Sequence, residues 1–398
     1  MKVLMFGWEF PPFSSGGLGT ACYGLTKSLS KKGIEITFVL PYSAEISDAD
    51  FLKIIPAGNI KIRKITSVLQ PYMSSQDYKN IVRKKSSPKI YGSSLFDEVY
   101  RYTLAAEKIA EEEEFDIIHC HDWMTFGAGI RAKQKKHKPL VLHVHATEHD
   151  RTGGHKVNQY VYDMERHGMH NSDKIIAVSN MTKNKIVENY GINPEKISVV
   201  HNAVDFSQHC FDENFEIKKN DKVVLFLGRI TLQKGPDYFV YSAKKVLEQE
   251  KNVKFVIAGS GDMEPFIIEK AAELGISDRV LFAGFLNQDD VERAYKMADI
   301  YVMPSVSEPF GITTLEALKN KTPAIVSKQS GVSEVIRHCL KVDFWDVDEI
   351  SNKIIALLRY KPLHETLKEN GYFEVKKFNW DVPAEKCMQV YNELISKG

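Results

Sequence analysis

Residues 300–318 read IYVMPSVSEPFGITTLEAL, and this stretch indicates how the chain folds. A short apolar run at 300–303 is followed by a polar loop, and then by apolar residues at helical spacing from 311 to 320. Apolar runs with little polar alternation are typical of strands in a parallel sheet that is covered on both faces. The stretch therefore predicts a strand, a loop and a helix, in that order.

The same pattern recurs along the whole chain. In the first half the predicted strands are 3–7, 34–40, 116–121, 140–146, 174–178 and 197–201. In the second half they are 223–228, 253–258, 280–285, 300–303 and 324–327, with helices near 235–250, 262–274, 288–297 and 311–320. Repeated units of this kind form doubly wound parallel sheets, whose strand C-termini share one edge. We expect an α/β protein with ligands at that edge.

The length of the chain predicts two domains, because 398 residues exceed the usual size of one hydrophobic core. We predict two Rossmann-like domains facing a cleft, residues 1–204 and 222–380, joined by the polar linker 205–221. Apolar residues recur at helical spacing in 381–398, with no strand after them. This last helix is expected to cross back to the first domain.

Composition excludes several classes of partner. Lys and Arg total 53 against 52 Asp and Glu, so no global positive field attracts nucleic acid. The five cysteines lack Cys-x-x-Cys spacing, which disfavours a disulfide framework and a zinc ribbon and fits a reducing cytoplasm. No apolar run approaches the ~20 residues that cross a bilayer. We expect a cytoplasmic protein that neither binds nucleic acid nor inserts into a membrane.

A glycine loop follows the first strand: Gly16-Gly17-Leu18-Gly19 leads directly into a helix. The backbone N–H groups of Gly17 and Leu18 are candidates for binding a donor phosphate, because glycine lets the chain approach and a helix N-terminus carries partial positive charge. A tight structural turn explains the loop equally well. Cys22 stands where a dinucleotide-binding motif has its third glycine, which disfavours a hydride-transfer enzyme.

Two cations follow the first strand of the second half. Arg229 stands at the strand end, and Lys234 comes five residues later in the turn before a helix. The planar fork of arginine and the compact charge of lysine together suit a diphosphate. Two surface cations without a ligand are the alternative interpretation.

The stretch 307–318 carries two carboxylates, Glu308 in the loop and Glu316 two turns into the helix. Their separation disfavours a close acid/base dyad and favours contacts to different parts of one extended ligand. The free N–H groups at the helix start, Gly311, Ile312 and Thr313, are candidates for a donor phosphate. Helix capping is the alternative role for Glu308.

Histidines gather at the ends of two predicted strands, at positions 119, 121, 143, 145 and 149. Converging with an acidic or thiol ligand, they could form a zinc site. The other interpretation is that their imidazoles hydrogen-bond sugar hydroxyls at the ligand edge without any metal. We favour the second interpretation and predict no metal ligand.

Together these motifs resemble the retaining nucleotide-sugar glycosyltransferases of the GT-B fold, particularly glycogen and starch synthases and sucrose-synthase-like enzymes. The resemblance spans nearly the whole chain, at 8–12 (WEFPP), 16–19 (GGLG), 119–123 (HCHDW), 178–179 (VS), 201–205 (HNAVD), 228–235, 259–261 (GSG) and 308–316. It implies that Arg229 and Lys234 hold the donor diphosphate. It also implies that Glu308 contacts the transferred sugar and that Glu316 holds the ribose.

In the first domain, the resemblance makes His145 the active-site histidine near the donor sugar and Asp122 a candidate for acceptor binding. Trp123 could stack on a sugar face, with core packing as the alternative. The sequence departs from bacterial glycogen synthases in two places. Ser14 and Ser15 replace a lysine, and Glu316 replaces a tyrosine.

The predicted activity is retaining α-glucosyl transfer from an NDP-glucose, either ADP- or UDP-glucose, to an α-glucan or another saccharide. No metal or other cofactor is expected, because Arg229 and Lys234 supply positive charge at the diphosphate. One alternative is a transferase of the same fold that acts on a small-molecule or lipid acceptor, as in sucrose-phosphate synthases. Another is a sugar-binding protein that has lost catalysis.

Overall fold

The computed structural model describes residues 1–10, 16–42, 60–66, 94–206 and 216–396. The chain divides into two compact units. Unit 1 comprises residues 1–148, 157–202 and 380–398, and unit 2 comprises 149–156 and 203–379.

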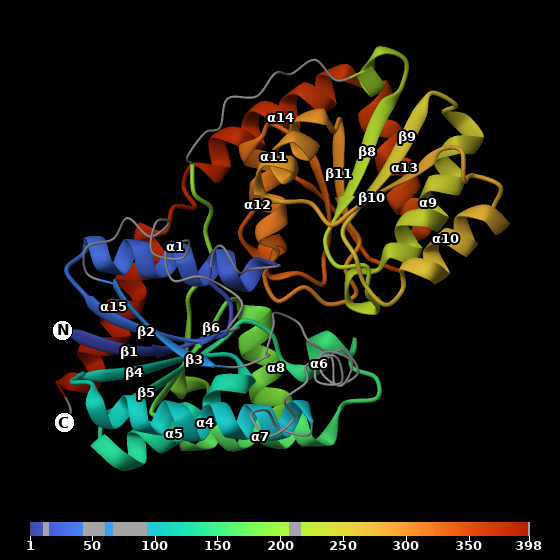
Figure 1. Ribbon diagram of the computed structural model, residues 1–398. Coiled ribbons are helices and arrows are strands. Elements are labelled where there is room, and N and C mark those ends of the chain that lie inside the picture. The colour runs from blue at the N-terminus through green and yellow to red at the C-terminus, as the bar shows by residue number, and fades with distance from the viewer. Residues whose placement is uncertain (11–15, 43–59, 67–93, 207–215, 397–398) are drawn as a thin grey trace. The chain divides into compact units, whose positions relative to one another are not determined.

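Unit 1 is built on a sheet of seven parallel strands in the order β3-β2-β1-β4-β5-β6-β7 (Figure 1). The strands are β1 (Lys2–Phe6), β2 (Glu35–Tyr42), β3 (Ile60–Thr66), β4 (Ile117–His121), β5 (Leu140–Val144), β6 (Lys174–Ala177) and β7 (Ile197–Val199). Its helices are α1 (Gly17–Lys31), α4 (Leu95–Glu112), α5 (Trp123–Lys136), α7 (Gln159–Asn171), α8 (Asn180–Tyr190), η1 (Pro194–Lys196) and α15 (Asp381–Ile395). Every residue of β4 and β5 is buried, as a sheet covered on both faces requires.

Capping residues explain where several helices begin. The side chain of Ser94 accepts a hydrogen bond from Asp97 N at the start of α4, and Asn158 does the same for Tyr160 and Val161 at the start of α7. Each cap satisfies backbone donors that have no partner inside the helix.

The C-terminal helix α15 packs on α1 within unit 1. Ser28 Oγ donates to Asp381 Oδ1 at 2.5 Å. The ring of Trp380 lies so close to Gly24 that a Cβ there would stand 2.2 Å from it. The expected return of the last helix to the first domain is therefore present.

Unit 2 is built on six parallel strands in the order β10-β9-β8-β11-β12-β13. They are β8 (Lys222–Leu227), β9 (Val253–Ala258), β10 (Val280–Gly284), β11 (Ile300–Met303), β12 (Ala324–Ser327) and β13 (Leu340–Val342). The helices are η2 (Glu216–Lys219), η3 (Leu232–Lys234), α9 (Pro236–Gln249), α10 (Glu264–Glu273), α11 (Gln288–Met297), α12 (Ile312–Lys319), η4 (Gly331–Glu334), α13 (Val347–Arg359) and α14 (Lys361–Val375). In Figure 1, α9, α10 and α13 lie on one side of this sheet, and α11, α12 and α14 lie on the other.

Three details differ from the predicted domain boundaries, the first being that Ala203 and Val204 belong to unit 2. Residues 149–156, which include most of the short helix α6 (Glu148–Arg151), belong to unit 2. Ser307 Oγ donates to Asp150 Oδ1 at 2.6 Å, which ties this segment to the loop after β11. Trp380 belongs to unit 1 because its ring packs on α1. Part of the predicted linker 205–221 lies outside the described residues.

Across the described ranges, no helix combines the length and the apolar character that spanning a bilayer requires.

Candidate active site

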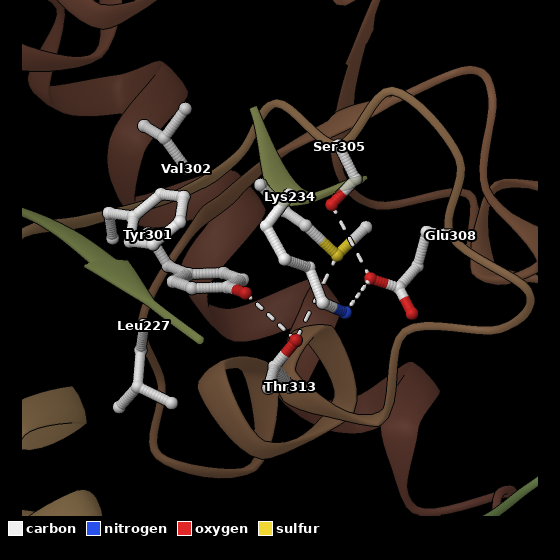
Figure 2. A pocket seen from close by; sticks show the side chains of 9 residues that line it. Leu227, Lys234, Tyr301, Val302, Ser305, Glu308 and Thr313 are labelled. Atoms are coloured by element: carbon white, nitrogen blue, oxygen red, sulfur yellow. Dashed lines mark hydrogen bonds and ion pairs between the residues drawn. The ribbon is translucent and has the colours of Figure 1, made fainter. Parts of the chain in front are cut away.

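A small pocket in unit 2 opens at the C-terminal ends of β8 and β11 (Figure 2). It is lined by Phe226, Leu227, Lys234, Tyr301, Val302, Met303, Ser305, Glu308 and Thr313. Ligands of doubly wound sheets bind at this edge. Of the predicted site residues, Lys234, Glu308 and Thr313 therefore share one pocket.

Lys234 ends the short helix η3, in the turn between β8 and α9. The turn closes at Gly235, whose left-handed backbone (φ 63°) lies against the loop that follows β11. A Cβ on this residue would stand 2.2 Å from the carbonyl oxygen of Pro304. Only glycine fits there, which explains the Lys234-Gly235 pair seen in the sequence.

The amine of Lys234 donates a hydrogen bond to Glu308 Oε2, and the two side chains point at one another in Figure 2. They form an ion pair in which the lysine side chain is 20% exposed and the glutamate side chain 9%. Ser305 Oγ contacts the same carboxylate oxygen at 3.4 Å. The pocket thus holds a cation and a carboxylate side by side.

The backbone around Glu308 is fixed by hydrogen bonds to the segment after β12. Glu308 N donates to Gln329 O, and Gly331 N donates to Glu308 O, both at 2.9 Å. This isolated parallel bridge holds the loop in a strand-like position. The carboxylate is therefore set in place by the fold before any ligand arrives.

Helix α12 begins next to this loop at Gly311, which has a left-handed backbone (φ 108°) and provides no side-chain cap. The first N–H groups of a helix have no partner inside it, so Ile312 and Thr313 present backbone donors at the helix start. Thr313 Oγ1 also accepts a hydrogen bond from Tyr301 at 2.8 Å, which fixes its side chain at the pocket wall. The sequence did not predict the role of Tyr301.

Glu316 lies further along α12 and does not line the pocket. Its Oε2 accepts a hydrogen bond from the hydroxyl of Tyr295 at 3.1 Å. Burial raises the pKa of the Glu316 carboxyl, although the Tyr295 hydrogen bond and the nearby Lys319 oppose the shift. The structure thus separates the environments of the two glutamates.

Arg229 lies in the turn after β8 but is absent from the pocket lining. Its guanidinium donates to Gln233 Oε1 at 3.0 Å, and Gln233 Nε2 donates to Ser307 O at 3.1 Å. Arg229 is thereby linked to the same loop that carries Glu308.

In unit 1, Asp122 is buried and binds the backbone that follows β5. Its Oδ1 accepts hydrogen bonds from the N–H groups of His145 and Ala146, at 2.6 and 3.2 Å. Its backbone lies at φ 60° and ψ 173°, a conformation found almost only for glycine. The carboxylate of Asp122 thus positions the His145 segment.

Trp123, the first residue of α5, is only 7% exposed. Its ring lies 6.4 Å from that of Phe96 on α4. Burial and the contact with Phe96 are what the core-packing interpretation of this tryptophan expects.

The histidines of β4 and of the β5 end form two hydrogen-bonded pairs. His121 Nδ1 lies 3.0 Å from His145 Nε2, and His119 Nε2 lies 3.3 Å from His143 Nδ1. The other ring nitrogen of His119 contacts the hydroxyl of Tyr391 at 2.5 Å. Parallel register places His121 beside His143, which explains how sequence spacing produced this cluster.

Burial keeps these imidazoles neutral. It lowers the pKa of His121 to about 3 and those of His119, His143 and His145 well below the ordinary value, and neighbouring histidines add to the last three shifts. His145 is the least buried of the four. A neutral His145 can donate a hydrogen bond to a sugar hydroxyl or accept one from it.

The glycine loop leads into α1 at Gly17, as the sequence predicts. Gly19 N donates to Oε2 of Glu9 at 3.2 Å, so one N–H of the helix start is already bound by a buried carboxylate. Gly17 is exposed and Leu18 is buried. Residues 11–15, which include Ser14 and Ser15, lie outside the described part of the chain.

Two doubly wound units with polar residues at their strand ends are the architecture of GT-B glycosyltransferases. The solved structure of sucrose-phosphate synthase from Thermosynechococcus elongatus has this fold. It superimposes with a TM-score of 0.81 over the full length of both chains, at 18% identity.

Comparison with protein families gives the class directly. A model of Glycosyltransferase Family 4 matches residues 15–208, and a model of Glycosyl transferases group 1 matches residues 209–373. The chain carries both of these domains and is a glycosyltransferase.

Curated relatives agree with this class. An uncharacterized glycosyltransferase of Methanocaldococcus jannaschii is 29% identical, over 98% of each chain. The glycogen synthase of Mycobacterium tuberculosis is 25% identical, over 84% of this chain and 80% of the synthase.

Proposed function

We propose that this glycosyltransferase moves glucose from an NDP-glucose, with retention at the anomeric carbon, to an α-glucan. The Lys234–Glu308 pair in the pocket of unit 2 carries the proposal. A sugar nucleotide joins an anionic diphosphate to a polyhydroxylated ring, and the pocket offers a cation for the first and a carboxylate for the second. The glycogen synthase relative supports glucan as the acceptor.

In this proposal Lys234 and Arg229 stabilise the negative charge that develops on the departing diphosphate. The backbone donors of Gly311, Ile312 and Thr313 bind the same phosphates at the start of α12. These groups supply the charge stabilisation, so the proposed reaction uses no metal or other cofactor.

Glu308 accepts hydrogen bonds from the transferred glucose, and Glu316 accepts them from the ribose. In unit 1, His145 contacts the donor sugar, and the N–H groups of Gly17 and Leu18 assist in binding the donor. No covalent nucleophile is assigned. The expected route is a front-face displacement assisted by the leaving phosphate.

Transfer to a small acceptor such as fructose 6-phosphate is the second candidate, and the full-length likeness to a sucrose-phosphate synthase favours it. Purified protein should be supplied with UDP-glucose and ADP-glucose separately, each with maltotetraose, fructose 6-phosphate or glucose, and the products resolved by mass. Growth of maltotetraose by hexose units is expected. A single addition to fructose 6-phosphate, with maltotetraose unchanged, would overturn the glucan assignment and leave the donor site intact.

A further inference from the structure

Three potential metal ligands from three elements of unit 1 converge near the end of β4. Cys22 comes from α1, His121 ends β4, and His145 follows β5. One ligand atom of each lies within 4.8 Å of the other two. Ligands at about 2.0–2.3 Å from a common zinc ion lie roughly 3–4 Å apart, so small side-chain rotations bring these three into range.

A second observation concerns a ring nitrogen of His121. His121 is fully buried, and within the described structure its Nε2 has no hydrogen-bond partner. Cys22 is a free thiol, 1% exposed. A buried polar nitrogen without a partner is costly and uncommon, and a bound metal ion would satisfy it.

We propose that Cys22, His121 and His145 form a binding site for a transition-metal ion, with Zn²⁺ as the preferred ion. A thiolate with two neutral imidazoles is the donor set that zinc prefers, and the ion would replace the proton of the Cys22 thiol. The partly exposed His145 gives access from solvent. Asp122 strengthens the site, because its carboxylate already holds the backbone of His145.

The neighbouring group His119, His121 and His143 is a less suitable site. Both ring nitrogens of His119 are engaged, one by Tyr391 and one by His143. All three residues are buried, so this group lacks an exposed ligand through which an ion enters. The thiol-containing set is therefore preferred.

Zinc in this site would inhibit transfer, and this consequence rests on the role proposed for His145 at the donor sugar. An imidazole bound to zinc is withdrawn from the substrate. The metal-free protein is thus the active form, and zinc acts as a reversible inhibitor.

Cobalt tests the site without any assay of activity. The full chain, stripped with EDTA and dialysed under reducing conditions, should be titrated with Co²⁺. We expect one ion per chain, a near-ultraviolet thiolate-to-cobalt absorption band, and a higher melting temperature. Cys22→Ser should abolish the band and weaken binding at least ~10-fold, and His121→Gln should weaken it similarly.

Cys120→Ser is the matched control. Cys120 is another buried thiol on β4, but its sulfur faces Gly129 on α5. The band should survive in this variant. Absence of a band in the wild-type protein would overturn the proposal, as would binding that is lost in His119→Gln and retained in Cys22→Ser.

Zinc inhibition is measured separately, with each rate expressed relative to the same protein without metal. Saturating Zn²⁺ should lower wild-type transfer several-fold and leave Cys22→Ser unaffected. If cobalt binds as described but zinc has no effect on transfer, the metal site stands and the role of His145 fails. If no transfer is found with any donor, the cobalt result still decides the site.

Discussion

Lys234 donates a hydrogen bond to Glu308, and both side chains line one pocket at the strand ends of unit 2. Each charge compensates the other, so the pocket holds no isolated buried charge before a donor binds. A diphosphate would share the lysine and leave the carboxylate free to accept hydrogen bonds from a sugar. The ion pair therefore prepares the site for a ligand with an anionic part and a hydroxylated part.

Lys234→Met should reduce both activity and stability. Loss of a charge-assisted contact worth roughly 1.5–3 kcal/mol lowers kcat/KM by ~10-fold to ~100-fold. Breaking this partly buried ion pair also leaves Glu308 without its cation, at a cost in the free energy of unfolding below the ~3–5 kcal/mol of a fully buried pair.

The double variant Lys234→Met/Glu308→Gln separates these two effects. It should regain much of the stability, because no isolated charge remains, but none of the activity. Urea denaturation and initial rates with NDP-glucose measure the two quantities. Wild-type activity in the double variant would refute the diphosphate assignment.

Glu308→Gln and Glu316→Gln should give different kinetic defects. Glu308 is assigned to the transferred sugar, so the variant Glu308→Gln should mainly have a lower kcat. Glu316 is assigned to the static ribose and hydrogen-bonds Tyr295 outside the pocket, so its amide should mainly raise the donor KM. Steady-state kinetics with varied donor distinguishes them, and identical defects would contradict the division of roles.

Glu316→Gln should also change how stability depends on pH. Because burial raises the pKa of Glu316, the folded state holds this proton more tightly than the unfolded state does. The stability of the wild-type protein therefore falls as pH rises from the ordinary glutamate value through the raised pKa. The glutamine in Glu316→Gln does not titrate, and its amide oxygen can still accept a hydrogen bond from Tyr295.

The melting temperature of Glu316→Gln relative to wild type should thus be highest at about pH 8 and decline towards about pH 5. Thermal melts across this range measure the difference. Lys319→Gln is a useful comparison, because Lys319 opposes the rise in the pKa of Glu316. Loss of this cation should raise that pKa further and make the stability depend more strongly on pH. A difference that is constant with pH would refute the assignment of the shift to Glu316.

Sequence periodicity predicted most of the fold. Each predicted strand is present, with ends that differ by no more than two residues. The two strands it missed, β3 and β13, are the outer strands of their sheets. Residues 60–66 (IKIRKIT) are rich in charge because an edge strand need not be buried on both faces, and β13 is only three residues long. Neither forms the apolar run that identifies a central strand.

The site was less predictable, because its contacts join distant parts of the chain. Sequence spacing placed Lys234 and Glu308 each in the loop after a predicted strand, and the structure pairs them directly. It gave no signal that Asp122 binds the backbone of His145, or that Cys22 lies near His121. Such contacts depend on strand order and register, which local patterns do not specify.

Transfer should continue in excess EDTA, because Lys234 and Arg229 are proposed to stabilise the diphosphate. Added Mg²⁺ should change the rate by less than about 2-fold, a small effect beside the several kcal/mol that a catalytic metal supplies. Initial rates after chelation, and again after addition of each metal, test this. Loss of activity in EDTA and its restoration by one metal would contradict the proposed mechanism. The site at Cys22 does not alter this expectation, because zinc there is expected to inhibit.

Asp122 offers a test of how unit 1 positions His145. Its carboxylate binds two N–H groups, while its backbone adopts a conformation that costs a residue other than glycine about 1–3 kcal/mol. Asp122→Gly relieves this strain and loses both hydrogen bonds, so its melting temperature should stay close to that of wild type. Its kcat should nevertheless fall at least ~10-fold, because the backbone carrying His145 is no longer held in place.

Asp122→Asn keeps an oxygen that accepts hydrogen bonds and should retain most of the activity. Asp122→Ala keeps the backbone strain but loses this oxygen, so both its stability and its rate should fall. Melting curves and donor-saturated rates for the three variants give the comparison. If Asp122 instead contacted the acceptor, Asp122→Asn would raise the acceptor KM strongly. A purely structural residue would lower melting temperature and rate together in Asp122→Gly. If Asp122→Gly loses kcat while its melting temperature is unchanged, Asp122 positions His145. That result would exclude both an acceptor contact and a purely structural role.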